Sequence, residues 1–400
     1  MSNRFTDCPL AIVGLGLRLP GADSLDAYWD MLVHGRHAIS PLPASRLDRQ
    51  RYYQPGPATA GKSYTQLGGT VPDEALAPGE LGLADAELAA ADRAHLWFLH
   101  VVLMALQNAG IDANDLEAQR YGIYVGHARG STLVGDLTYS ASVESLTAAL
   151  QRSPVANTLP AQELAQLSST IVEKTHARYP RFQEDGGPFV QPSAAAGLVA
   201  RRLKTVGPYM AVDAACASSF AALDIAARAL HAGEIEAAIV GGCSYNQWSS
   251  LVLFSQAQAL SATGSFPFDE RADGFISSDG YAAIIVEPLW RAQALAHKPL
   301  AIIRGIGGSC DGRGKSLWAP LKEGQIEAIS RAYQADVTPR SIQVVEAHAT
   351  GTAVGDATEL SALAEVFGGA AQDEQNSAAA KLPISSVKAN IGHTRETAGL

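Results

Sequence analysis

The sequence predicts an α/β protein in which a mostly parallel sheet is covered by helices. Short β-branched or apolar runs bounded by glycine recur along the 400 residues and have the length of buried strands. Helical patterns separate several of these runs, as expected when parallel strands are joined by helices. The 37 glycines and the aromatic content of 7% suit tight strand-to-helix turns and closely packed helices.

The expected strands share a core of Val, Ile and Ala. Helical patterns at residues 95–110 and 220–233 each end in a glycine, which suits a left-handed helix cap. In chain order the expected strands are LAIVGLGL (10–17), YGIYVGHA (121–128), YMAVDAA (209–215), AAIVGG (237–242), AAIIVEP (282–288), LAIIRGIGG (300–308), IQVVEAHAT (342–350) and PISSVKANIGH (383–393).

One arrangement occurs twice, at residues 209–230 and 342–367: a strand, a turn of small residues, then a helix. The first turn carries Cys216 and the second carries His348. Because active sites gather at the carboxyl ends of strands, two similar halves facing each other would bring these turns together.

Two segments stand apart from this pattern. Residues 130–187 are more polar, contain two helix-like patches, and predict a surface layer or a lid. Residues 367–382 predict an exposed loop.

Composition excludes several classes of protein. A net charge of −10 without a Lys/Arg stripe excludes a nucleic-acid groove. The start lacks a signal peptide, and no apolar run is long enough to span a membrane, so we expect a cytoplasmic protein without a membrane span. The four cysteines, at positions 8, 216, 243 and 310, form no disulfide framework or metal knuckle, and we expect no metal.

Neither nucleotide-binding motif that the chain imitates is complete. In GGSCDGRGKS, Ser309 stands where a P-loop needs its first glycine. In VGLGLRLPG, Leu19 stands where the dinucleotide fingerprint needs its third glycine. Nucleotide binding is therefore not expected.

Cys216 is the first candidate for chemistry. It lies where a strand pattern ends and a helix pattern begins, so unpaired N–H groups and the helix dipole would favour its thiolate. That effect is about 0.3–2 kcal/mol and leaves the thiol only marginally ionised at neutral pH. A buried thiol that fills a small gap is the alternative interpretation.

His348 and His393 are the other candidates. Each follows a buried-strand pattern, and each alone is better explained by a structural role. A cysteine and two histidines that all lie at strand ends favour a catalytic site, because covalent catalysis needs a nucleophile beside such groups.

These motifs give the chain a resemblance to the β-ketoacyl synthase (ketosynthase) family, in particular to the condensing domains of type I polyketide and polyunsaturated-fatty-acid synthases. The resemblance covers essentially the whole chain and rests on four motifs in family order. They are LAIVGLGLRLPGADSLDAYWDMLVHGRHAIS (10–40), VDAACASS (212–219), VEAHATGTAVGDATE (345–359) and SSVKANIGHT (385–394).

The resemblance implies a thiolase-like fold of two pseudo-equivalent mixed-sheet halves in α-β-α-β-α layers. Residues 1–288 would form the half that carries the nucleophile and the insertion. Residues 299–400 would form the half that carries both histidine motifs. The family usually forms homodimers, so a homodimer is expected.

The family's chemistry transfers by position. Cys216 would accept an acyl group from an acyl carrier protein, and a malonyl-type extender would then lose carbon dioxide and attack the acyl-cysteine. His348 and His393 would donate hydrogen bonds to the extender's thioester carbonyl. No cofactor would be bound permanently, because phosphopantetheine arrives on the carrier protein. An acyltransferase domain in the same synthase is a further expected partner.

Four other positions match family residues. Lys388 resembles the family's buried lysine and Glu359 its carboxylate partner, an ion pair that would hold the histidine loop in place. Thr350 and Thr352 match positions that hydrogen-bond the pantetheine arm, with turn-forming threonines as the alternative.

Departures from the family narrow the interpretation. DRAHL (92–96) stands where modular enzymes have DPQQR, which argues against a standard modular assembly-line domain. The alanine in DAACASS, together with the long charged stretch at residues 169–189, is more similar to iterative, polyunsaturated-fatty-acid or enediyne-type synthases. SSDG (277–280) replaces the usual RGEG. The family continues past the second histidine to a Gly-Phe-Gly loop, so we expect that these 400 residues are an excerpt that condenses poorly alone.

Three alternatives to condensation stay open. A non-elongating or transacylating ketosynthase keeps the cysteine but does not condense. An idle scaffold of the same fold usually lacks it. A cysteine hydrolase would need an orienting Asn or Asp motif.

Overall fold

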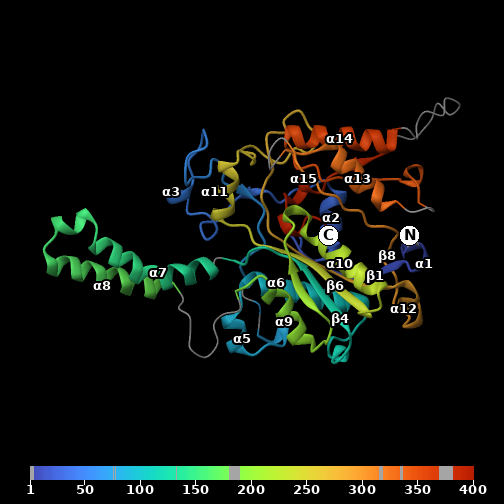
Figure 1. Ribbon diagram of the computed structural model, residues 1–400, viewed down its shortest axis with the longest axis horizontal. Coiled ribbons are helices and arrows are strands. Elements are labelled where there is room, and N and C mark those ends of the chain that lie inside the picture. The colour runs from blue at the N-terminus through green and yellow to red at the C-terminus, as the bar shows by residue number, and fades with distance from the viewer. Residues whose placement is uncertain are drawn as a thin grey trace.

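A six-stranded mixed sheet with helices on both faces forms the centre of the molecule, which confirms the predicted α/β class (Figure 1). The computed structural model describes residues 4–74, 76, 78–131, 133–179, 190–314, 319–333, 337–368 and 382–400. The strand order is β5-β4-β6-β7-β1-β8, in which β4, β5 and β6 are parallel while β7, β1 and β8 pair antiparallel. The strands are β1 (Leu10–Arg18), β4 (Tyr121–Gly126), β5 (Tyr209–Val212), β6 (Ala237–Ser244), β7 (Gly280–Pro288) and β8 (Ala301–Ile303).

Side chains on the two faces of the sheet enter two different cores. In β4, Ile123 and Val125 pack with α6 (Arg93–Ala109) and α9 (Ser193–Leu203), whereas Tyr124 points to the opposite face and packs with α10 (Ser218–His231). This alternation follows from the two-residue period of a strand, and both faces are apolar because both are covered. The helix predicted at 95–110 is α6, and Gly110 ends it with φ +71°, as expected.

The C-terminal half adds one strand to this sheet, because β8 pairs with β1. Within the described residues, its other paired strands are β9 (Val345–Glu346) and β10 (Ile384–Ser385), which are parallel and largely exposed. Helices α13 (Lys322–Ala332) and α14 (Ala353–Gly368) pack beside each other on this side of the molecule (Figure 1). Most of the expected loop at 367–382 lies outside the described residues.

Smaller elements complete the body. They are α1 (Arg4–Asp7), α2 (Leu25–Val33), β2 (Ser40–Pro41), α3 (Arg49–Tyr52), β3 (Leu67–Gly68), α4 (Pro78–Leu81), α5 (Asp85–Ala90), α11 (Trp248–Gln256), α12 (Leu289–Ala294) and α15 (Lys388–Ile391).

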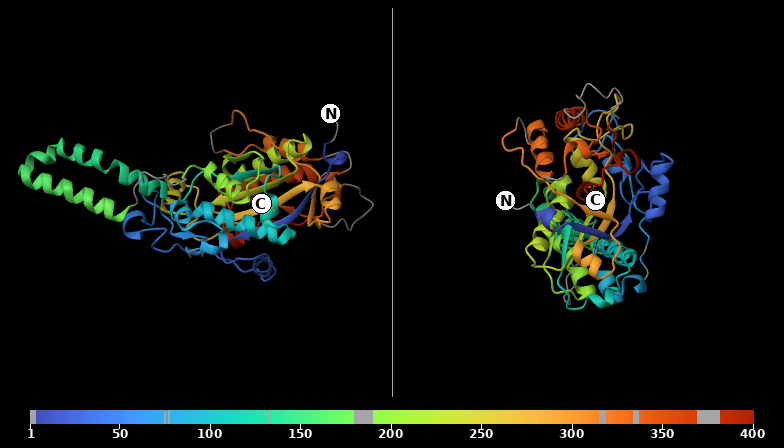
Figure 2. Two further views of the ribbon diagram at one scale, coloured as in Figure 1. Left: turned by 90° about the horizontal axis from the view of Figure 1, so that it is seen from below. Right: turned by 90° about the vertical axis from the view of Figure 1, so that its right-hand side faces the viewer.

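The polar insertion forms a helical hairpin of α7 (Leu133–Gln151) and α8 (Ala161–Arg178), which projects away from the body in both views (Figures 1 and 2). It is not the surface layer or lid that the sequence predicted. The two helices pack against each other instead. Gln151 of α7 donates a hydrogen bond to Ser168 Oγ of α8 at 3.3 Å, and Val143 of α7 is buried. No helix in the described part of the chain is long and apolar enough to cross a membrane.

The carboxyl end of the central sheet holds the last segment of the chain. A Cβ at Gly242, in β6, would lie 2.5 Å from the Cα of Thr397, and one at Gly126, in β4, would lie 2.9 Å from the carbonyl oxygen of Glu396. Only glycine leaves room for such close backbone contact. The residues that follow His393 are therefore seated directly on the ends of β4 and β6, beside β5, the strand that leads to Cys216.

We predict that Gly242→Ala lowers the free energy of unfolding by about 1–3 kcal/mol, because the new methyl group must push the backbone of Thr397 away. Urea denaturation followed by circular dichroism measures the change. Gly135→Ala is the matched control: no described atom lies within 4 Å of its added Cβ, and alanine favours the helix by roughly 0.5–1 kcal/mol. Equal stability of Gly242→Ala and the unsubstituted chain would contradict this packing.

Candidate active site

Cys216 lies in a tight turn between β5 and α10, as the sequence predicted. The turn is sharp because Ala215 adopts the left-handed conformation, with φ +52°. Its neighbours hold it there: Asp213 Oδ1 accepts the Ala215 N–H at 3.0 Å, and Ser218 Oγ donates to the Ala215 carbonyl oxygen at 2.6 Å. Small residues at this turn leave the half-buried sulfur open to one side.

His348 stands in the loop between β9 and α14. Glu359 lies in α14. Its two carboxylate oxygens accept hydrogen bonds from the backbone N–H groups of His348 and Ala349, each at 2.7 Å. Ala349 is in the left-handed region, with φ +24°. The carboxylate therefore fixes a strained loop by gripping its backbone.

The expected ion pair between Lys388 and Glu359 is not formed. Lys388 is buried, and its Nζ lies 3.5 Å from the carbonyl oxygen of Ala347. Within the described residues no carboxylate forms a salt bridge with Lys388. Both carboxylate oxygens of Glu359 accept hydrogen bonds from backbone N–H groups instead. Burial lowers the pKa of Lys388, while the surrounding carboxylates of Glu346 and Glu359 oppose this shift.

His393 is held like a residue of an extra strand. Its N–H donates to the Ile276 carbonyl oxygen at 2.7 Å, and its own carbonyl oxygen accepts the Ser278 N–H at 3.0 Å. Ser278 Oγ also donates to the Ile391 carbonyl oxygen at 2.5 Å. The SSDG stretch, for which the sequence offered no account, thus forms the cradle of the second histidine.

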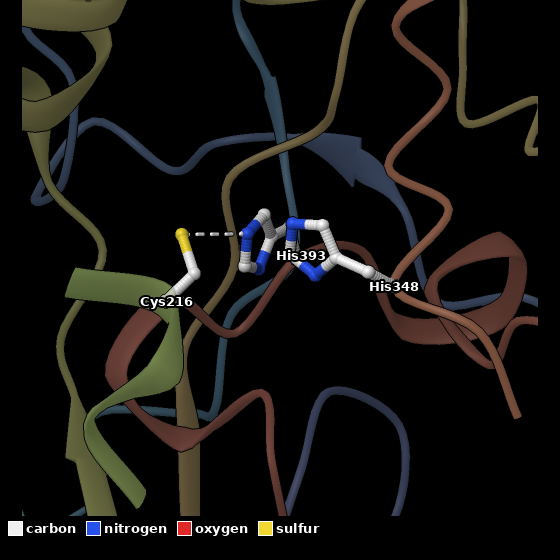
Figure 3. A group of neighbouring side chains, drawn as sticks. All are labelled: Cys216, His348 and His393. Atoms are coloured by element: carbon white, nitrogen blue, oxygen red, sulfur yellow. Dashed lines mark hydrogen bonds between the residues drawn. The ribbon is translucent and has the colours of Figure 1, made fainter. Parts of the chain in front are cut away.

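The structure brings Cys216, His348 and His393 together although they come from three separate segments (Figure 3). His393 Nε2 lies 3.1 Å from Cys216 Sγ. The two imidazole rings meet edge to face, with centroids 5.3 Å apart and an interplanar angle of 85°. Their ligand-type atoms all lie within 4.8 Å of one another.

Hydrogen bonding determines which nitrogen of His393 carries the proton. The Arg395 backbone N–H donates to His393 Nδ1 at 3.1 Å, so in the neutral ring the proton resides on Nε2, which faces Cys216. Burial, with the nearby His348, holds the pKa of His393 well below its ordinary value. A protonated Nε2 has no lone pair for a metal, so this ring is arranged to donate a hydrogen bond.

His348 is also neutral at physiological pH. Burial, together with the ammonium group of Lys388, lowers the pKa of His348 to about 4. Two neutral imidazoles beside the sulfur can donate hydrogen bonds to an oxygen on which negative charge develops.

The thiol of Cys216 departs from the sequence-based expectation. Burial and then the Glu396 carboxylate raise the pKa of this thiol, while Lys388 and Arg395 oppose the rise. The position at a helix start is as predicted, but desolvation by the protein atoms around the half-buried sulfur outweighs the effect of the helix dipole on the pKa. Glu396, three residues after His393, is buried and was not predicted from the sequence.

The two threonines of the first histidine motif lie side by side. Thr350 Oγ1 and Thr352 Oγ1 are 3.2 Å apart. Between them, the Gly351 N–H donates to Asp356 Oδ1 at 3.1 Å, and the other oxygen of Asp356 accepts the Phe268 N–H at 2.7 Å. The buried Asp356, also missed from sequence, ties this turn to the N-terminal half.

Comparison with known proteins identifies the family. The profile described as beta-ketoacyl synthase, N-terminal domain, matches residues 7–292, and that of the C-terminal domain matches residues 300–400. The chain belongs to the β-ketoacyl synthase family. The resemblance inferred from its four motifs is confirmed.

The curated relatives of this ketosynthase chain are polyketide synthases. It is 34% identical over 397 residues to a phenolphthiocerol/phthiocerol polyketide synthase of Mycobacterium tuberculosis, and 33% identical over 397 residues to erythronolide synthase EryA2 of Saccharopolyspora erythraea. Each alignment covers 98% of this chain but only 23% and 10% of the two relatives. The chain thus spans less than a quarter of their length.

Solved ketosynthase structures share the fold. The ketosynthase from module 6 of the Bacillus subtilis bacillaene synthase is 30% identical, with a TM-score of 0.76 over 98% of this chain and 59% of that one. The PfaC keto synthase–chain length factor is 25% identical, with a TM-score of 0.81 over 98% of this chain and 40% of that one. The expected thiolase-like fold is confirmed, while the choice among iterative and related clades stays a prediction.

We predict that Glu359→Gln weakens the His348 loop by about 1–2 kcal/mol, because the new amide group faces a backbone N–H that then has no acceptor. Hydrogen–deuterium exchange of the peptide around His348 should speed up. Glu365→Gln, on the same helix, removes only a surface salt bridge to Lys322 and should change exchange little. Unchanged protection of the loop in Glu359→Gln would refute the role given to this carboxylate.

Proposed function

We propose that this chain catalyses acyl transfer to Cys216 followed by decarboxylative Claisen condensation with a malonyl-type extender. The observation that carries the proposal is the protonated Nε2 of His393, held 3.1 Å from Cys216 Sγ beside a second neutral imidazole. Membership of the β-ketoacyl synthase family supports it.

In the first step, the Cys216 sulfur attacks the carbonyl carbon of an acyl thioester. A new C–S bond forms, the old thioester C–S bond breaks, and the proton of the thiol leaves with the departing thiol. A pKa raised by burial keeps the resting sulfur protonated, which protects it while no acyl donor is bound.

In the second step, the extender loses carbon dioxide and its thioester becomes an enolate. The negative charge collects on the thioester oxygen, where the Nε2–H of His393 and a ring N–H of His348 can donate hydrogen bonds. The enolate carbon then attacks the acyl-cysteine, and the Cys216 sulfur leaves. Neutral donors suit this step, because they stabilise the enolate without having to protonate it.

Partners follow from the same chemistry. We infer that both acyl groups arrive on the phosphopantetheine arm of an acyl carrier protein, without a permanently bound cofactor, and that an acyltransferase domain of the same synthase loads the extender. The multidomain polyketide synthases among the relatives support this. Thr350 and Thr352 follow His348 in the same loop, and we propose that their hydroxyl groups bind the arm. We place the protein in the cytoplasm, in keeping with its four free cysteines.

Mass spectrometry after incubation with acyl carrier protein tests this function. We predict an acyl group on Cys216, no acylation of Cys216→Ala, and normal acylation of the control Cys310→Ala, whose thiol is exposed and remote from the site. His393→Ala should lower carbon dioxide release from malonyl carrier by roughly 10²–10³-fold, because a donor to the enolate is lost.

Each alternative predicts a different result. Acylation without carbon dioxide release would assign a transacylating ketosynthase. Free acid as the product would assign a hydrolase. Absence of acylation from the full-length protein would assign a scaffold.

We also propose that two copies of the chain pair through β5. In the described part of the chain this strand is at the edge of the sheet, bonded only to β4, and it exposes Tyr209 and Met210. Beside it lies a hollow of about 800 Å³ lined by α9 and β5 residues, with Val206 also exposed. An exposed apolar edge strand is a natural site for another strand. Because β5 leads directly into the Cys216 turn, such a dimer would brace the nucleophile.

Met210→Glu should shift the protein toward the monomer in light scattering coupled to size exclusion, because a charge would be buried between two strands. Val33→Glu, which places the same charge on the exposed face of α2, should not. A dimer unaffected by Met210→Glu would rule out pairing through β5.

A further inference from the structure

Arg395 is a buried cation directly behind the second histidine. Only 7% of the residue is exposed. Its Nη1 donates to Ser250 Oγ and its Nη2 to the Tyr245 carbonyl oxygen, each at 2.7 Å, and its Nε lies 3.7 Å from Glu396 Oε2. A buried guanidinium is costly, and the Nε of this one has no hydrogen-bond partner among the described residues. The two short bonds of its Nη1 and Nη2 fork nevertheless clamp it between α11 and the segment that follows β6.

The backbone of Arg395 is unusual as well. Its φ is +49°, in the left-handed region that side chains with a Cβ rarely adopt. Such a conformation persists where the surrounding structure determines it, and here the guanidinium clamp supplies that constraint. Its result is geometric: the Arg395 N–H turns back toward the ring two residues earlier and donates to His393 Nδ1 at 3.1 Å.

That single N–H determines what His393 can do. If Nδ1 carried the proton, two hydrogens would face each other, and Nε2 would present a lone pair to the substrate oxygen instead of a donor. The proton must therefore be on Nε2, beside Cys216 Sγ.

The charge of Arg395 acts at the same place. The guanidinium opposes the rise in the Cys216 pKa that burial and Glu396 cause, and it also favours the neutral form of His393. Lys388 is the other cation that acts on both groups.

We propose that Arg395 is a positioning residue: its guanidinium, clamped by Ser250 and the Tyr245 carbonyl, holds the left-handed backbone that fixes the Nε2–H tautomer of His393. A second effect follows from the same geometry: Arg395 contacts the ring of His393, whose other nitrogen lies 3.1 Å from Cys216 Sγ, so its positive charge is placed near the sulfur and favours the thiolate. The consequence for condensation rests on the function proposed above, whereas the effects on His393 and Cys216 do not.

Three substitutions separate the clamp from the charge. Arg395→Gln removes both. Arg395→Lys keeps the charge but replaces the planar fork of two nitrogens with a single nitrogen, which cannot reproduce the geometry of both bonds. Arg395→Gly removes side chain and charge but adopts the left-handed conformation freely. Arg228→Gln, which removes an exposed arginine paired with Asp224 on α10, is the matched control.

The first readout is the tautomer of His393. Nitrogen-15 spectra of histidine-labelled protein distinguish a protonated from an unprotonated ring nitrogen, and the His393 signals are those missing from His393→Gln. We expect the Nε2–H tautomer in the unsubstituted chain, in Arg395→Gly and in Arg228→Gln. Mixed tautomers are expected in Arg395→Gln and Arg395→Lys.

The second readout is the pH profile of Cys216 alkylation by iodoacetamide, followed by mass spectrometry of the Cys216 peptide. At neutral pH the rate should fall about threefold to tenfold in Arg395→Gln and Arg395→Gly, because a nearby cation is lost. It should stay close to the unsubstituted value in Arg395→Lys and Arg228→Gln. If Arg395 only stabilised the fold, neither the His393 tautomer nor the alkylation profile would change in this pattern.

Thermal unfolding identifies the variants that fold, and the folded ones decide the proposal. A folded Arg395→Gln or Arg395→Lys that retains a pure Nε2–H tautomer overturns the clamp, and an unchanged alkylation profile in Arg395→Gln or Arg395→Gly overturns the charge effect. Neither readout needs a carrier protein. Both can therefore succeed if condensation is never observed, which would reject the proposed function alone.

Discussion

The site depends on one contact above all, the seating of the segment from His393 to Gly399 on the carboxyl end of the central sheet. Cys216 and His393 are 177 positions apart in the chain. Each lies on its own turn, and no local interaction brings the two turns together. Close backbone contacts at Gly126 and Gly242 lock the two turns together. The Gly399 N–H adds a hydrogen bond to Ser219 Oγ at 3.0 Å, on the first turn of the nucleophile's helix.

A second buried cation, Arg46, supports this contact. Arg46 is 2% exposed and pairs with Asp279 at 3.1 Å and Asp73 at 2.9 Å. Its net stabilisation is small, because desolvation offsets most of the attraction between such charges. Its geometric effect is larger. Asp279 also accepts the Val71 N–H at 2.8 Å. This bond holds the SSDG stretch, which forms the cradle of His393, in place.

The sequence predicts the class of fold, the helix ends and the three reactive residues, because strand and helix periodicity and motif spacing are local properties. Cys216 and His348 lie at strand ends for that reason. What it misses depends on distant neighbours. The partner of Glu359 is its own loop backbone rather than Lys388, and Asp356, Arg395 and similar buried charges gain their roles only when both halves pack. The projecting hairpin escaped prediction because its polar helices bury their inner faces against each other.

The electrostatics of the site favour the second step of the proposed reaction over the first. A thiolate forms more readily when the cysteine pKa is lowered, yet burial and Glu396 raise the pKa of Cys216. Once acylated, however, the sulfur has no charge to stabilise, and the same dry surroundings then strengthen every hydrogen bond that reaches the enolate oxygen. Burial also keeps His348 and His393 uncharged throughout. Because a neutral imidazole donates a proton far less readily than an imidazolium, an enolate formed in the proposed reaction would survive long enough to attack the acyl-cysteine, and this is the step that such a condensation must protect.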